Sequence, residues 1–162
     1  MVRLFLLSLL LIAGSASADI LTGRVVKVTD GDTITVLDAS KTQHTIRLAG
    51  IDAPERKQPY GEASRKHLAS LIAGQAVTVN WKKLDKYRRI VGVITFNGQD
   101  VNLEQIRNGY AWHYKAYERE QSPADRQAYA DAEREARAKR WGLWQDKNPM
   151  PPWEWRARVG RQ

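Results

Sequence analysis

The sequence predicts a protein of the α+β class, in which one small β-barrel carries helices on its outside. Three predicted strands come first: residues 24–29 and 33–37 are rich in Val, Ile and Thr, and residues 45–50 alternate between polar and apolar side chains. A helical pattern follows them, then two more strand patterns and further helical patterns. This order, three strands, a helix, two strands and then helices, suits a five-stranded Greek-key barrel with about three flanking helices. Several other α+β folds share the same order.

Each element has a local signal in the sequence. The Asp30-Gly31 pair predicts a tight hairpin turn between the first two strands. In the third strand, apolar residues alternate with Thr45 and Arg47, as they do in a half-buried strand. The remaining elements are expected at residues 61–73 (helix), 76–81 and 90–96 (strands), 101–108 (helix) and from Ser122 onward (helix). In the last helix, alanines at positions 124, 128, 132 and 136 predict a close-packing ridge.

The first 18 residues have the pattern of a cleaved signal peptide. Arg3 precedes a nearly unbroken apolar run, Leu4–Ile12, and Ala16-Ser17-Ala18 provides the small residues that signal peptidase recognises. This run of nine residues, eight of them apolar, is too short for a helix that spans a bilayer, which needs about 20. We therefore expect an exported protein, periplasmic or secreted, with no stable membrane association after cleavage; an uncleaved anchor is the alternative.

Removal of residues 1–18 would leave 144 of the 162 residues, enough for one domain. We expect this domain at residues 19–144, followed by a Pro- and Trp-rich extension at 145–162 that forms a strap on the domain or a partly ordered tail. The net charge of +8 falls only to +7, because Arg3 is the one charge lost. Such a basic domain favours a polyanionic partner, whether nucleic acid, anionic lipid or acidic polysaccharide. The absence of cysteine excludes disulfides, thiolate metal sites and cysteine nucleophiles.

Two acidic clusters lie at the predicted ends of neighbouring strands. The first is Asp30-Gly31-Asp32-Thr33, and the second is Ile51-Asp52-Ala53-Pro54-Glu55. Alone, the first is more simply a hairpin turn and the second a solvated loop. Together they would concentrate up to four carboxylates in a basic chain, which is unfavourable unless a cation neutralises them. Ca²⁺ accepts such an irregular shell of oxygen ligands.

Basic residues accompany these acids. Arg47 lies on the polar side of its strand, and the run Asp85-Lys86-Tyr87-Arg88-Arg89 leads into the fifth strand. A run of this kind is usually a solvated loop. Phosphoryl transfer nevertheless needs this combination, because guanidinium groups bind the charged phosphate and a free carboxylate takes a proton from the attacking water.

In these motifs the chain resembles the staphylococcal nuclease (thermonuclease) family. The resemblance rests on Asp30–Thr33, on Ile46-Arg47-Leu48 with Asp52–Glu55, and on Asp85-Lys86-Tyr87 with Arg89. It extends through Gly61–Ser64, Asn108–Ala111 and Trp141–Trp144, and so covers about residues 21–144. The resemblance implies the OB-fold barrel and a Ca²⁺-dependent endonuclease, expected to be a monomer. It would hydrolyse DNA and RNA with low sequence specificity, cleaving the 5′ P–O bond to give 3′-phosphorylated products.

The resemblance also implies roles for particular residues. Asp32 and Asp52 would bind Ca²⁺ through their side chains and Ala53 through its carbonyl. Glu55 would be the general base, and Arg47 and Arg89 would bind the phosphate and stabilise its transition state. Three residues would contact the substrate: Lys86 and Tyr87 at a neighbouring phosphate, and Tyr117, with Tyr114 as the alternative, against a base.

The chain departs from the family pattern at Ala53 and at Arg88. Ala53 stands where a threonine is frequent, which a carbonyl ligand tolerates. Arg88 stands where glycine is frequent, so either the turn takes another backbone conformation or the added charge points to phosphate. Two other functions remain open: an OB module that binds nucleic acid without cleaving it, and a basic binder of acidic cell-surface polymer. Retention of the acids and arginines together favours the enzyme.

Overall fold

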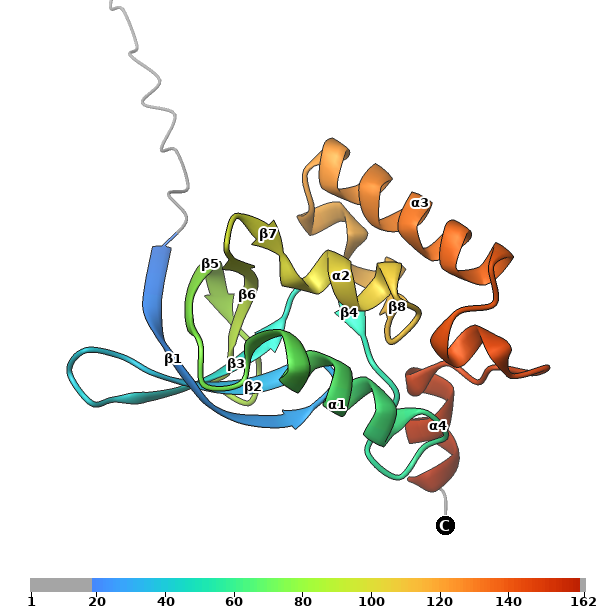
Figure 1. Cartoon of the computed structure of the whole chain (residues 1–162), viewed down its shortest axis with the longest axis horizontal. Coiled ribbons are helices and arrows are strands. Elements are labelled where there is room, and N and C mark those ends of the chain that lie inside the picture. Colours follow the sequence, from blue (N-terminus) through green and yellow to red (C-terminus); the bar gives the residue numbers. More distant parts are fainter. Residues whose placement is uncertain (1–18, 161–162) are drawn as a thin grey trace, which may run out of the picture.

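The structure is a computed structural model that describes residues 19–160; the predicted signal peptide, residues 1–18, lies outside the described residues (Figure 1). The strands are β1 (Asp19–Asp30), β2 (Thr33–Leu37), β3 (Gln43–Leu48), β4 (Ile51–Asp52), β5 (Ala76–Leu84), β6 (Ile90–Phe96), β7 (Gln99–Asp100) and β8 (Trp112–His113). The α-helices are α1 (Gly61–Ile72), α2 (Val101–Arg107), α3 (Pro123–Ala138) and α4 (Pro152–Val159). Two 3₁₀ helices lie at Lys115–Glu120 and Gly142–Gln145.

Five of these strands close a barrel, as the sequence predicted. The main sheet has the order β3-β2-β1-β5-β6-β7, and β3 also pairs with β6, which joins the two sides of the sheet. This closing pair is parallel and places Arg47 opposite Val91. β7 adds a short edge to β6, and β4 pairs with β8 in a separate two-stranded sheet. The OB-type α+β architecture is confirmed.

The first strand is longer than expected, because it serves two neighbours. Its first half, from Asp19 to Arg24, pairs with β5, and its second half, from Arg24 to Asp30, pairs with β2. The hairpin turn between β1 and β2 consists of Gly31 and Asp32, because Asp30 pairs with Thr33. The prediction that placed the turn at Asp30-Gly31 is therefore wrong by one residue.

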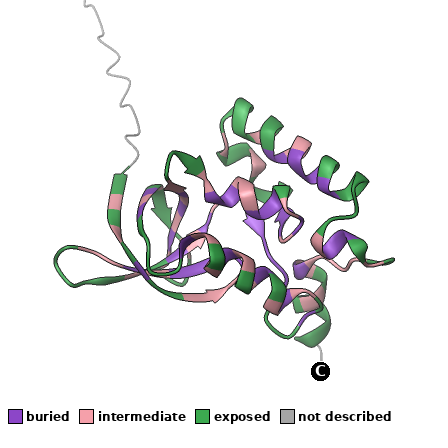
Figure 2. Ribbon diagram, in the orientation of Figure 1, coloured by how far each residue is buried: buried purple, intermediate pink, exposed green. Residues whose placement is uncertain are grey.

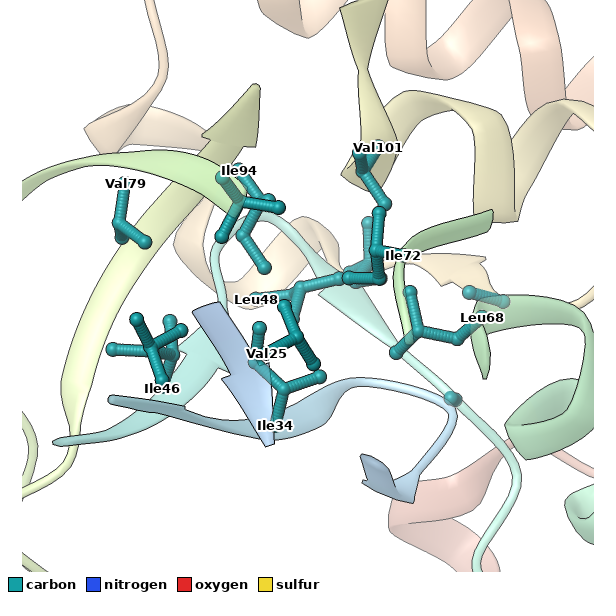
Figure 3. Packing of buried hydrophobic residues seen from close by; sticks show 14 of the residues in the cluster. Val25, Ile34, Ile46, Leu48, Leu68, Ile72, Val79, Ile94 and Val101 are labelled. Atoms are coloured by element: carbon teal, nitrogen blue, oxygen red, sulfur yellow. The ribbon is translucent and has the colours of Figure 1, made fainter. Parts of the chain in front are cut away.

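The barrel interior and the inner faces of α1 and α2 form one hydrophobic core (Figures 2 and 3). Ile34, Ile46 and Leu48 come from the strands, and Leu68 and Ile72 from α1; each is at most 1% exposed. Burial of such side chains stabilises the fold by about 1.5–3 kcal/mol each. The core thus fixes the strand ends that carry the acidic clusters.

The third helix buries a different stripe from the predicted one. Ser122 caps it by accepting a hydrogen bond from the nitrogen of Asp125, as the sequence indicated. Its buried residues are, however, Tyr129, Ala132, Glu133 and Ala136, whereas Ala124 and Ala128 are exposed. The predicted alanine ridge is wrong for its first half. A strict spacing of four drifts around a helix of 3.6 residues per turn, and the large Tyr129 ring determines which face is buried.

The C-terminal extension lies against the domain. In Figure 1, α4 sits beside the beginning of α1. Trp112, Ala136, Leu143 and Trp144 form a second buried cluster, against which Tyr60 and Trp153 pack. Trp112 meets Trp144 and Trp153 edge-on, with ring centroids 4.5 and 5.6 Å apart. Within residues 19–160, every helix is too short or too polar to cross a membrane.

Candidate active site

The turn between β1 and β2 places Asp32 on a packed base. The backbone nitrogen of Asp32 donates to Asp30 Oδ1 at 3.2 Å, and the Thr33 hydroxyl donates to Asp32 Oδ1 at 3.1 Å. Beneath the turn, the buried Gln105 amide donates to the Gly31 carbonyl at 2.7 Å. These bonds fix the direction of a carboxylate that is only 8% exposed.

The second acidic cluster is held by the small β4–β8 sheet. In that sheet Asp52 lies opposite Trp112, and the Asp52 side chain is fully buried. The next residue, Ala53, donates its backbone N–H to Asp32 Oδ2 at 2.7 Å. The two clusters, distant in sequence, are therefore in direct contact.

Arg47 joins the two acids. Its Nη2 donates to Asp52 Oδ1 at 2.8 Å, and its Nη1 forms an ion pair with Asp32 Oδ2. The guanidinium is 16% exposed. Burial alone would lower the pKa of Arg47, but the charges of Asp32 and Asp52 outweigh it and raise the pKa. One cation thus holds two buried carboxylates side by side.

Negative charge remains in excess around Asp32 and Asp52, even with Arg47 between them. Burial and the neighbouring charge of Asp32 raise the pKa of Asp30 to about 7. Burial also raises the pKa of Asp52, against the opposing effects of Arg156 and Arg47. A carboxyl group that retains its proton near neutral pH indicates a site in which another positive charge would be favourable.

The residues present fit a hard cation of the predicted kind. Asp32 and Asp52 offer carboxylate oxygens, and the excess acidity around Asp30 supplies the electrostatic attraction. Ca²⁺ takes six to eight oxygen ligands, so water and substrate oxygens would complete the shell. In the described part of the chain, no group of three or more acidic, His or Cys side chains forms a ready-made metal cluster. The expected set of four carboxylates is thus not assembled as one cluster.

Glu55 lies next to the Asp32–Asp52 pair, in the loop that connects β4 to α1. Its side chain is 37% exposed, and Oε1 accepts a hydrogen bond of 2.7 Å from Arg156 Nη1. The same guanidinium contacts Asp52 Oδ1 at 3.2 Å and Oδ2 at 2.8 Å. The sequence does not indicate a role for Arg156, because no local pattern distinguishes it from the other basic residues of the extension.

The basic turn is organised by Asp85. Asp85 Oδ1 accepts from the backbone nitrogens of Tyr87 and Arg89, and Oδ2 accepts from Arg89 Nε at 2.7 Å. Burial opposes ionisation of Asp85, but these bonds and the charge of Arg89 prevail and lower its pKa. Arg89 and Lys86 also lie over the Tyr87 ring, at 5.4 and 5.0 Å from its centroid. The structure thus gathers Lys86, Tyr87 and Arg89 around Asp85.

Arg88 adopts the left-handed conformation, with φ of 62°. Glycine takes this conformation easily, whereas other residues are strained in it. The turn of this chain thus holds Arg88 in a conformation that suits the glycine frequent at this position in the family.

The two candidate base-stacking tyrosines have different surroundings. Tyr117 is 49% exposed, and the Lys83 ammonium lies 4.9 Å from its ring centroid. Tyr114 is half-buried and stacks against Trp153 of the extension, with centroids 5.5 Å apart. Tyr117 is the tyrosine with more ring surface open to a substrate.

Comparison with known proteins matches residues 45–146 to the family model "Staphylococcal nuclease homologue". The chain belongs to the staphylococcal nuclease family. It is also similar to an "Uncharacterized endonuclease" of Haemophilus influenzae, with 40% identity over 95% of this chain and 85% of the relative. An "Uncharacterized endonuclease" of Escherichia coli is 45% identical over 84% and 85% of the two chains, and "Micrococcal nuclease" of Shigella flexneri is 42% identical over 83% and 79%.

Membership of this family makes the chain a nuclease, a hydrolase of nucleic acids. The acidic centre with its arginines is the candidate active site on the geometry described above. Nucleases of the staphylococcal nuclease family generally depend on a metal ion. The family that the sequence motifs predicted is therefore confirmed. The roles of the individual residues stay predictions.

Proposed function

We propose that this nuclease is a Ca²⁺-dependent endonuclease that hydrolyses DNA and RNA with little sequence preference. The observation that carries the proposal is the pair of buried carboxylates, Asp32 and Asp52, bridged by Arg47. Two acids and an arginine in contact suit a reaction in which a cation and a phosphate are bound side by side.

Asp32, Asp52 and the Ala53 carbonyl would hold Ca²⁺, which when bound would offset the charge of the carboxylates and of the phosphate. Glu55 then takes a proton from the water that attacks phosphorus. Arg47 and Arg89 contact the phosphate oxygens, where negative charge grows in the transition state. The bond from phosphorus to the 5′-oxygen breaks, and the phosphate stays on the 3′-oxygen.

Arg89 is held ready for this contact. Asp85 binds its Nε side, and this ion pair fixes the direction of the guanidinium. Through the parallel β3–β6 pair, Arg89 precedes the strand that carries Val91 opposite Arg47. Two residues along a strand span about 7 Å, so the two arginines start from neighbouring positions on the barrel.

Substrate contacts outside the reacting phosphate would come from exposed side chains. Lys86 and Tyr87 of the basic turn would contact a neighbouring phosphate, and the Tyr117 ring would stack on a base. Stacking does not distinguish bases, which is why low sequence specificity is expected.

Digestion of single-stranded DNA, double-stranded DNA and RNA with Ca²⁺ or with excess chelator tests the proposal. We expect cleavage of all three only with Ca²⁺, and product ends that carry a 3′-phosphate. Full activity in chelator, or 5′-phosphate ends, would contradict the proposed chemistry.

We also propose that the enzyme acts outside the cytoplasm, because residues 1–18 have the pattern of a signal peptide. Mass spectrometry of the exported protein should show a first residue of Asp19. A mature chain that retains Met1–Ala18 would refute cleavage.

A further inference from the structure

Arg156, on the C-terminal helix α4, reaches the centre of the candidate active site. Its Nη2 contacts Asp52 Oδ2 at 2.8 Å, and its Nη1 contacts both Asp52 Oδ1, at 3.2 Å, and Glu55 Oε1, at 2.7 Å. The Arg156 side chain is 43% exposed, whereas the Asp52 side chain is fully buried. Arg156 is therefore the cation that connects the predicted metal ligand to the predicted general base.

Aromatic packing fixes the position of α4 and thereby orients Arg156. Trp153 packs edge-on against Trp112, which lies opposite Asp52 in the β4–β8 sheet. Trp153 also stacks against Tyr114, with 23° between the ring planes. Arg156 follows Trp153 by three residues, close to one helical turn, so it lies on the same face of α4. The aromatic contacts thus direct Arg156 toward Asp52.

The loop that carries Glu55 is held by the same extension. The Glu55 backbone nitrogen donates to Gln58 Oε1 at 3.0 Å, and Gln58 Nε2 donates to the Met150 carbonyl at 2.7 Å. Gln58 is only 6% exposed. Glu55 is therefore fixed at its backbone through Gln58 and at its side chain through Arg156.

We propose that Arg156 is a positioning residue for Glu55, so that the C-terminal extension is part of the active site. The inference rests on the proposed role of Glu55 as the general base. Arg156 binds Oε1 of this carboxylate and thereby orients Oε2 toward the attacking water. Precise placement of a catalytic group by a hydrogen-bonded neighbour typically changes rates by about 10- to 100-fold.

The contacts distinguish Arg156 from Arg47. Arg47 binds Asp32 and Asp52, whereas Arg156 binds Asp52 and Glu55. Arg156 thus has the contact with the predicted general base on which a positioning role depends.

A double-mutant cycle tests the proposal with four proteins: the parent, Arg156→Ala, Glu55→Gln and the double variant. We expect Arg156→Ala to lower kcat for a Ca²⁺-supported oligonucleotide assay by about 10- to 100-fold, with little change in KM. In the Glu55→Gln background the same substitution should have almost no further effect. Arg156→Lys should recover part of the loss.

Arg158→Ala is the matched control, because Arg158 is exposed on the same helix and lies about 200° around it from Arg156. DNA affinity of the two Glu55→Gln proteins, measured by fluorescence anisotropy, gives a readout besides turnover and should agree within about twofold. Thermal melting identifies any variant that fails to fold; if Arg156→Ala does, Arg156→Lys and Arg156→Gln complete the cycle.

Three results would overturn the positioning role. Losses that multiply in the double variant would mean that Arg156 acts independently of Glu55. Faster cleavage by Arg156→Ala would make the contact inhibitory, and activity equal to that of Arg158→Ala would make it irrelevant. A parent that shows no Ca²⁺-dependent cleavage would instead refute the proposed function itself.

Discussion

Asp32 accepts a hydrogen bond of 2.7 Å from the backbone nitrogen of Ala53, which ties together two loops that are 21 residues apart. The bond brings two of the predicted metal ligands into contact. It also makes the geometry of the site sensitive to changes in the turn and in the charges around it.

Replacement of Arg47 by alanine should destabilise the metal-free protein by about 3–5 kcal/mol, because it leaves two buried carboxylates without their shared cation. Urea unfolding in chelator measures the change. Added Ca²⁺ should recover part of it, since a bound cation reduces the same repulsion. Arg65→Ala, which removes a partly exposed ion pair with Glu62, provides the control. An equal loss in both variants would show that Arg47 has no special part in holding the acids.

Stability of the metal-free protein should fall as pH rises from about 4 to about 7. Burial and Asp32 raise the pKa of Asp30 to about 7, above the value of 3.8 for an unperturbed side chain. Between these values the folded state binds more protons than the unfolded state, so the free energy of unfolding decreases with pH. Asp30→Asn should reduce this slope. Urea unfolding in chelator at pH 5 and pH 8 tests both statements, and a slope unchanged in Asp30→Asn would refute the assignment.

Glu55→Gln should lower kcat by about 10²- to 10⁴-fold, because the amide cannot accept the proton from water. DNA binding should change little, since the base acts in the transition state more than in the bound substrate. Single-turnover cleavage and anisotropy measure the two quantities. Glu135→Gln, on the exposed side of α3, controls for the loss of one negative charge. If Glu55→Gln cleaved as fast as this control, the predicted role of Glu55 would be wrong.

Gly31→Ala should destabilise the protein by about 1–3 kcal/mol through overpacking, although Gly31 has an ordinary φ. A Cβ at this position would overlap the Ser64 hydroxyl and come within 2.8 Å of Ala53 Cβ. The turn that carries Asp32 would therefore shift, and nuclease activity should fall as well. Denaturant unfolding and the cleavage assay measure the two effects. Ser64→Gly, introduced as a second substitution, should restore part of both; no recovery would indicate that the clash with Ser64 is unimportant.

Much of the fold could be predicted because its signals are local. Strand alternation placed Ile46 and Arg47 on opposite sides of β3, and the structure buries the first and directs the second to the acids. The first acidic cluster follows β1, and Arg47 lies near the end of β3. Thr33 of β2 pairs with both Asp30 and Arg47, which brings these two ends together. Regular alternation and the antiparallel pairing of consecutive strands are enough to predict this much of the site.

The remainder depends on contacts between distant segments. The sequence pattern gave equal weight to four alanines of α3, but the buried face is selected by Tyr129, whose hydroxyl donates to Asp100 at 2.7 Å. Arg156 contacts a carboxylate 104 residues away, and no local period marks such a residue. The tryptophan cluster that directs α4 is likewise visible only once the chain has folded.

The Asp52–Arg156 contact can form only late in synthesis of the chain. Synthesis proceeds from the N-terminus, so the acids of the barrel exist well before the residue that neutralises them from α4. A chain that is cut or stopped before Trp153 would keep the whole barrel yet lack the helix that contacts Glu55. We therefore expect proteolytic removal of α4 to lower nuclease activity while the β-barrel stays folded.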